Sequence, residues 1–195
     1  MLEDAAERKD NRMNVYRDME TVDLFLSLGS NEGNREENIE NALSLLNIEL
    51  KTPYKALSSL IETDPWGFDS DNKFLNAVVH YELKFPKEYN PEAEGLMILA
   101  CCKKVERMMG RTGKTEFDEN GKRVYKDRPI DIDILLFGDN KIDTEELTVP
   151  HKLMYERDFV MEPLREIAGQ AGNDVSYGDD DVIPDLIGDL KDNIN

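Results

Sequence analysis

The sequence predicts an α+β fold of the ferredoxin-like type, a βαββαβ sheet with helices packed on it and additional C-terminal elements. The prediction rests on four strand-like segments, on two segments with apolar residues at helical spacing, and on their order along the chain. With 195 residues, of which 39% are hydrophobic, the chain can build one compact domain. We place this domain at residues 21–170, between a disordered extension, 1–20, and an acidic tail with a short apolar segment, 171–195.

The first half of this domain supplies three of the strands and one helix. Residues 22–28 form the first predicted strand, which ends at a glycine. Asn34 and Glu37 resemble a capping box that opens a helix. The helix carries an apolar stripe at positions i, i+3, i+4 and i+7, made of Ile39, Ala42, Leu43 and Leu46. Apolar segments bounded by turn residues predict the second and third strands, at 54–63 and 74–83.

The second half supplies another helix and the fourth strand. Residues 96–109 return to helical spacing, and Gly110 is placed to end that helix. The fourth strand is predicted at 130–137, and a short helix near 153–164 is one of the added C-terminal elements. Residues 112–127, between helix and strand, show no periodic apolar pattern. We interpret them as a loop that closes over a site, with a passive surface insertion as the alternative.

Composition restricts the classes of partner. A net charge of −18 argues against a nucleic-acid or anionic-membrane partner, because such proteins need a basic surface. The first residues contain no apolar segment typical of a secretory leader, and the longest apolar run is too short to span a bilayer, so we expect neither a leader nor a membrane span. Cys101 and Cys102 are adjacent within a helical pattern, which does not fit a disulfide framework. We expect a cytoplasmic protein, a monomer or a weak dimer, that acts on small molecules.

The fourth strand carries the clearest chemical signal. Its residues alternate between Ile and Asp, so Asp131 and Asp133 project from one face of the strand, roughly 7 Å apart. Paired carboxylates are costly to bury unless a cation compensates them. Mg²⁺ bound to a phosphate suits such a pair. The alternative is an edge strand with a wet acidic face, which the apolar residues that follow make less favourable.

The other candidate motifs give weaker evidence for a functional site. The triplet Gly113-Lys114-Thr115 is not a P-loop, because Met108 occupies the position of the first glycine and a helix precedes the triplet. His80 lies among apolar residues and is interpreted as structural, whereas His151 follows Pro150 and could meet a ligand. No local signature predicts a nucleophile paired with a base.

Six motifs occur in an order and spacing that resemble one known family. They are LGSN at 28–31, ETDPWG at 62–67, FLNAV at 74–78, ERMMGR at 106–111, RPIDID at 128–133 and LTVPH at 147–151. Over about residues 22–168, which is most of its length, the chain resembles the 6-hydroxymethyl-7,8-dihydropterin pyrophosphokinases of folate biosynthesis. These enzymes transfer diphosphate from ATP to the pterin hydroxymethyl group and release AMP.

The resemblance implies roles for individual residues. Two Mg²⁺ ions on the triphosphate of ATP would be held by Asp131 and Asp133, and the catalytic set would add Arg111 and Arg128. The pterin would be bound by Thr63, Pro65, Trp66, Phe74, Asn76 and Phe159, with the two phenylalanines on either side of the ring. ATP would be bound by Glu106, Lys114, Ile134, Thr148, His151 and Arg157.

Some positions depart from the family pattern. Gly113 and Glu146 stand where some relatives carry basic residues, and Lys103 replaces a residue that often contacts adenosine. Tyr125 stands where a tryptophan often lies, within a loop that is longer than in compact relatives. Two alternatives to the diphosphokinase therefore stay open: a catalytically silent pterin-binding module, and a Mg²⁺-dependent phosphohydrolase or nucleotidyltransferase.

Overall fold

The computed structural model describes residues 18–67, 70–111, 116–117, 123–124 and 127–171. Most of the predicted N-terminal extension and C-terminal tail lies outside these residues, and so does most of the 112–127 segment, with Lys114 and Tyr125.

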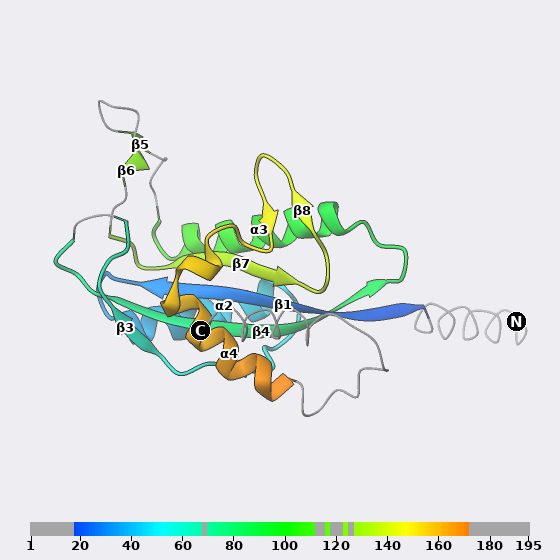
Figure 1. The fold of residues 1–195 in the computed structure, drawn as a ribbon, viewed down its shortest axis with the longest axis horizontal. Coiled ribbons are helices and arrows are strands. Elements are labelled where there is room, and N and C mark those ends of the chain that lie inside the picture. Colours follow the sequence, from blue (N-terminus) through cyan, green and yellow to red (C-terminus); the bar gives the residue numbers. More distant parts are fainter. Residues whose placement is uncertain (1–17, 68–69, 112–115, 118–122, 125–126, 172–195) are drawn as a thin grey trace, which may run out of the picture.

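One antiparallel sheet forms the centre of the molecule (Figure 1). Its long strands are β1 (Met19–Ser30), β4 (Phe74–Pro86) and β7 (Asp131–Phe137). The short strands β2 (Ala56–Leu57) and β3 (Ile61–Thr63) both pair with β4. The order β2-β4-β1-β7 places β1 and β4 at the centre, where the ferredoxin-like arrangement has its first and third strands, so the predicted fold class is confirmed.

Three helices cover the sheet on its two faces. Helices α2 (Arg35–Glu49) and α3 (Pro91–Met108) pack on one face, and α4 (Asp158–Ala171) packs on the other. The Asn34 side chain caps α2 as predicted, since its Oδ1 accepts a hydrogen bond from the Glu37 amide at 3.4 Å. Asn90 caps α3 in the same way, which explains why α3 begins before the predicted residue 96.

The central strands contribute apolar side chains to the cores on both faces of the sheet. The larger core lies under α2 and α3 and includes Leu24, Leu26 and Leu28 of β1. Ile130, Ile132 and Ile134 are buried in the same core, as the period-two pattern predicts. The smaller core lies under α4 and is formed by Phe25, Val78, Leu135, Met154, Val160, Met161, Leu164 and Ile167.

The second predicted strand is interrupted. The sequence predicts a continuous strand over 54–63, but β2 and β3 pair with β4 in registers that differ by one residue. Ser58 lies at the break, where its amide donates to Val78 O at 3.0 Å and its Oγ accepts from Val78 N at 2.9 Å. A side chain thus replaces one backbone partner, which is why the break is stable.

Two predicted elements have different bounds. The expected helix at 153–164 is a short 3₁₀ turn, η1 (Met154–Glu156), followed by α4, whose buried stripe continues past residue 164. The 112–127 segment was predicted to lack regular structure, but it contains a pair of short strands, β5 (Glu116–Phe117) and β6 (Arg123–Val124). A further hairpin joins β8 (Ile142–Asp143) to β9 (Thr148–Val149).

Strand β7 is the last strand of the sheet order, whereas the sequence argued only against an edge that is open to water. Its outer edge is covered instead by groups from other elements. The Leu135 carbonyl accepts a hydrogen bond from His151 N at 3.0 Å, and the Ile132 amide donates to the Glu106 side chain at 2.9 Å. Covering the edge in this way satisfies backbone groups that would otherwise be open to pairing. Among the described residues, no helix is long and apolar enough to cross a membrane.

Candidate active site

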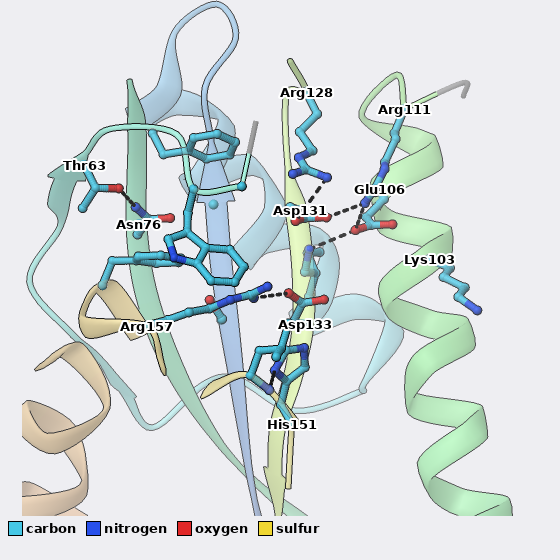
Figure 2. Close-up of a pocket in the computed structure, with 18 of the residues that line it drawn as sticks. Thr63, Asn76, Lys103, Glu106, Arg111, Arg128, Asp131, Asp133, His151 and Arg157 are labelled. Carbon is cyan, nitrogen blue, oxygen red and sulfur yellow. Dashed lines mark hydrogen bonds and ion pairs between the residues drawn. The ribbon is translucent and has the colours of Figure 1, made fainter. Parts of the chain in front are cut away.

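A cleft of about 540 Å³ opens where β1, β4 and β7 meet the C-terminal end of α3 and the start of α4 (Figure 2). Its walls combine charged, aromatic and small residues from segments far apart in the sequence. They are Ser27, Gly29, Thr63, Asp64, Trp66, Gly67, Phe74, Asn76, Leu99, Lys103, Glu106, Arg111, Arg128, Asp131, Ile132, Asp133, Glu146, His151, Leu153, Arg157 and Phe159.

The two aspartates of β7 project into the cleft side by side, as predicted from the alternation (Figure 2). Arginines from three connecting segments surround them. Asp131 pairs with Arg111 at 2.6 Å and with Arg128 at 3.4 Å, and Asp133 lies 3.8 Å from Arg157. The carboxylates are therefore compensated by guanidinium groups from outside the strand.

The compensation of Asp133 is incomplete. Loss of hydration and the neighbouring charge of Asp131 raise the pKa of Asp133 to about 7, although Arg157 opposes the shift. The side chain is still 41% exposed toward the cleft, so a ligand can reach it. Among the described residues, no group of three or more His, Cys, Asp or Glu side chains could hold a metal. Two carboxylates fit Mg²⁺, which takes its remaining ligands from water and phosphate.

Glu106 of α3 combines a structural contact with an electrostatic one. Its carboxylate accepts the hydrogen bond from Ile132 N and pairs with Arg111. Burial raises the pKa of Glu106, while Arg111 counteracts that rise. Burial alone would lower the pKa of Arg111, but Asp131 and Glu106 together raise it. Arg111 thus stays charged between two acids at the junction of α3 and β7.

The opposite side of the cleft is neutral. The Asn76 side chain is 4% exposed and donates a hydrogen bond to Thr63 Oγ1 at 2.9 Å. Gly29 lies beside it in the strand pairing, and a Cβ there would approach Asn76 Oδ1 to 3.0 Å. The missing side chain of Gly29 therefore leaves room in front of Asn76 and Phe74.

Aromatic side chains complete this neutral side. Phe74 is 8% exposed, whereas Trp66 is 45% exposed at the rim. The Arg157 guanidinium lies 4.6 Å from the Trp66 ring centre and 5.9 Å from that of Phe159. Arg157 therefore contacts an aromatic residue and an aspartate, and it joins the neutral side to the charged side.

His151 lines the cleft next to Asp133 (Figure 2). Its Nδ1 accepts a hydrogen bond from Leu153 N at 3.3 Å, which places any ring proton of the neutral form on Nε2. Burial lowers the pKa of His151, and the charge of Arg157 lowers it further. A neutral imidazole with Nε2–H is a hydrogen-bond donor at neutral pH.

The structure brings most of the predicted site residues together. Of those that it describes, only Pro65, Ile134 and Thr148 do not line the cleft. The Ile134 side chain is 3% exposed and lies in the core, so only its backbone could contact a ligand. His80, interpreted as structural, is buried and bonded to Asp23 at 2.7 Å.

Several residues that line the cleft were given no role from the sequence, although Gly29, Gly67 and Ile132 lie within the family motifs: Ser27, Gly29, Gly67, Leu99, Ile132 and Leu153. For two of these residues, the sequence contains a pattern that indicates their place in the cleft. Ser27 and Gly29 pair with Asp133 and Asp131, and they are the small residues in the non-leucine row of β1. Small residues beside paired aspartates indicate space above the sheet.

Comparison with known proteins gives one consistent result. The family model described as 7,8-dihydro-6-hydroxymethylpterin-pyrophosphokinase (HPPK) matches residues 25–169. The chain belongs to the HPPK family. It is 43% identical over 146 residues to the 2-amino-4-hydroxy-6-hydroxymethyldihydropteridine pyrophosphokinase of Porphyromonas gingivalis, covering 74% of this chain and 90% of that relative. The Bacillus subtilis protein of the same name is 34% identical over 157 residues, covering 80% and 84%. That of Aquifex aeolicus is 36% identical over 144 residues, covering 74% and 79%.

The predicted resemblance to the HPPK family is therefore confirmed, and with it the prediction that the chain is an enzyme of the transferase class. Small molecules are the substrates of such an enzyme, and ATP is the co-substrate of an HPPK. The cleft lies within the matched residues, which include both aspartates of β7 and the α4 residues that face it.

Proposed function

We propose that this HPPK transfers the diphosphoryl group of ATP to the hydroxymethyl oxygen of 6-hydroxymethyl-7,8-dihydropterin, releasing AMP and the pterin diphosphate. The observation that carries the proposal is the juxtaposition of two chemically distinct halves in one cleft. Asp131 and Asp133 lie on one side of Gly29, and Asn76 lies on the other side of it. A flat heterocycle on one side is thereby placed against a triphosphate on the other.

The neutral half suits the pterin. The Asn76 carboxamide offers both a donor and an acceptor, which matches the mixed hydrogen-bonding edge of a pterin. Phe74 and Phe159 would lie on either face of the ring, and Thr63, Pro65 and Trp66 would close the pocket. The space in front of Gly29 accommodates the ring beside Asn76.

The charged half suits the nucleotide. Asp131 and Asp133 would hold two Mg²⁺ ions together with the triphosphate, and bound Mg²⁺ supplies charge neutralisation for the attacking and leaving oxygens. Glu106, His151, Thr148 and the Ile134 backbone would contact the nucleoside, and Lys114 would reach the phosphates. Arg157 Nε is buried without a hydrogen-bond partner among the described residues, which favours an anionic ligand beside it.

The arginines would change partners during the reaction. In the free protein, Arg111 and Arg128 pair with Asp131, and Arg157 approaches Asp133. When the carboxylates bind cations, these guanidinium groups can turn to the phosphate oxygens. The pterin hydroxyl oxygen would then attack the β-phosphorus and the bond from that phosphorus to the α,β-bridging oxygen would break. The bonding electrons stay on that oxygen, which leaves as part of AMP, and the hydroxyl proton passes to solvent water. Positioning and charge neutralisation account for such catalysis without a protein nucleophile.

Other features of the proposal concern the protein in the cell. We propose a cytoplasmic enzyme that works as a monomer or weak dimer and does not bind nucleic acid. The net charge of −18 supports the last point, because it repels a polyanion.

The test is product analysis with purified protein, ATP, MgCl₂ and reduced hydroxymethylpterin. We expect AMP and the pterin diphosphate in equal amounts, with no AMP when the pterin or MgCl₂ is omitted. ADP or free pyrophosphate as the main product would instead indicate a phosphohydrolase or nucleotidyltransferase. Pterin binding without turnover would indicate a silent binding module.

A further inference from the structure

A polar cluster outside the residues assigned above joins three segments at the rim of the cleft. The Asp127 carboxylate accepts hydrogen bonds from Asn31 Nδ2 at 2.6 Å and from Ser70 Oγ at 2.7 Å, both on Oδ1. The Asn72 side-chain amide donates to its second oxygen. The donors come from the end of β1 and from the segment that enters β4, so one acid fastens two segments far apart in the sequence.

The same cluster fixes the backbone of Arg128. The Asn31 side chain accepts a hydrogen bond from Arg128 N on Oδ1 at 2.8 Å, and the backbone N–H of Asn31 donates to Arg128 O at 3.2 Å. Asn31 is only 2% exposed, so its carboxamide needs its two partners, Arg128 N on Oδ1 and Asp127 on Nδ2. Arg128 in turn reaches Asp131, 3.4 Å away, and its guanidinium lies 5.6 Å from the Phe74 ring centre.

The position of Asp127 therefore relates the two halves of the cleft. On one side it is bonded to residues 70 and 72, which lead directly into Phe74 at the start of β4. On the other side it precedes Arg128, which points at the carboxylates of β7. A solvated surface acid would not accept three side-chain donors from two other segments.

We propose that Asp127 is a positioning residue, which couples the pterin-side segment at 70–72 to the orientation of Arg128. This inference rests on the proposed diphosphokinase function, because it assigns Arg128 to the phosphates and Phe74 to the pterin. Asp127 touches neither substrate in this scheme. It sets the backbone of Arg128 and the approach of the segment before Phe74 at the same time.

The experiment compares steady-state kinetics of Asp127→Ala, Asn72→Ala and the double variant. Asp71→Ala is the matched control, since it removes an exposed acid from the same segment. We expect Asp127→Ala to raise the pterin KM and lower kcat, each by about tenfold, while the ATP KM changes less than about twofold. Asn72→Ala should raise the pterin KM by about threefold with kcat nearly unchanged, because it cuts only the pterin-side bond. In the double variant the Asn72 substitution should add nothing.

Several outcomes would overturn the proposal. A purely structural role would lower Tm and the fraction of active sites, leaving kcat per active site and both KM values unchanged. Independent effects of the two substitutions in the double variant would show that Asp127 does not transmit the contact of Asn72. If Asp127→Ala does not fold, unchanged kinetics of the exposed Asn72→Ala variant would still reject the coupling. Failure of the wild-type protein to release AMP would reject the proposed function and with it the basis of this inference, whereas wild-type AMP release with unchanged Asp127→Ala kinetics would reject the inference alone.

Discussion

The two halves of the cleft hold themselves together in different ways. On the β4 side, Asn76 is fixed by one neutral hydrogen bond to Thr63 and by the packing of Phe74. On the β7 side, three carboxylates face three arginines and are held by ion pairs: Asp131, Asp133 and Glu106 against Arg111, Arg128 and Arg157.

The two kinds of contact prepare the halves differently for a ligand. The neutral half is already shaped, because Thr63 holds the Asn76 side chain and Phe74 is packed in place before a ligand binds. In the charged half the acids already pair with arginines, although the charge of Asp133 is only partly compensated, and a ligand must exchange these partners. We therefore expect substitutions in the neutral half to act on binding of one substrate, and those in the charged half to act on turnover and on the stability of the free protein.

The largest expected effect is on turnover in the charged half. Asp131→Ala and Asp133→Ala should each reduce kcat by roughly a thousandfold or more, because each removes part of the proposed metal clamp worth several kcal/mol. AMP release measured at saturating substrate and varied MgCl₂ tests this. Circular dichroism should show an intact fold, and near-normal Mg²⁺-dependent turnover by either variant would contradict the assignment.

In the neutral half, Asn76→Ala should weaken pterin binding by about 1–3 kcal/mol, because buried polar groups lose their partner. Phe159→Ala should act on the same ligand through lost ring contact. Titration calorimetry with the pterin and with an ATP analogue separates the two sides. Equal losses of affinity for the pterin and for the ATP analogue would contradict the assignment of the two ligands to separate halves of the cleft.

The charged half should also depend on pH in the metal-free protein. Asp133 titrates near pH 7 in the folded protein, above its ordinary value near 4 when unfolded. Its stabilising contribution is therefore complete below about pH 4 and is lost as the pH rises through 7. Because the side chain is 41% exposed, we expect a loss of only about 1 kcal/mol.

Urea unfolding at several pH values measures the contribution of Asp133 to the free energy of unfolding, with Asp133→Asn as the reference. The difference in free energy of unfolding between the two proteins should shift in favour of the variant between pH 4 and 7. MgCl₂ together with an ATP analogue should reverse that shift in the wild-type protein. A pH-independent difference would show that Asp133 ionises normally.

The smallest expected effect is on the free energy of unfolding and concerns α4, the helix that carries Phe159 of the neutral half. Glu166 of α4 accepts hydrogen bonds from Ser59 N at 3.0 Å and Ser59 Oγ at 2.9 Å, at the break between β2 and β3. Glu166→Ala should lower the free energy of unfolding by about 0.5–1 kcal/mol, since both groups are exposed. Glu162→Ala, an exposed acid on the same helix, is the control for loss of charge. Equal effects of the two would remove any special role for the Ser59 contact.

Periodicity and capping sufficed to predict the fold class, because the central strands bury continuous rows of apolar residues. The row of leucines in β1 and the isoleucines of β7 show this directly. The broken second strand was missed because Ser58 acts through its side chain, which no apolar pattern records. The coverage of the β7 edge was missed for a similar reason, since Glu106 comes from a distant helix.

The site was predictable where chemistry and spacing coincide. Asp131 and Asp133 follow from the strand alone, whereas the aromatic and ATP-contact roles depended on resemblance to the HPPK family. The Asp127 cluster could not be foreseen, because its partners are 96 and 57 positions away in the chain. Ordinary polar residues at such separations carry no periodic signal.

The last helix has a consequence for how the protein is made. Arg157 and Phe159 enter the cleft from the start of α4, which covers the sheet face opposite α2 and α3. Every other described wall of the cleft is synthesised earlier in the chain. During translation, the sheet and the aspartates of β7 can therefore form on the ribosome before the aromatic wall is complete. Until α4 has emerged and docked, the nascent chain exposes the apolar face that this helix will cover. The completion of the site and the burial of that face are one event in biosynthesis.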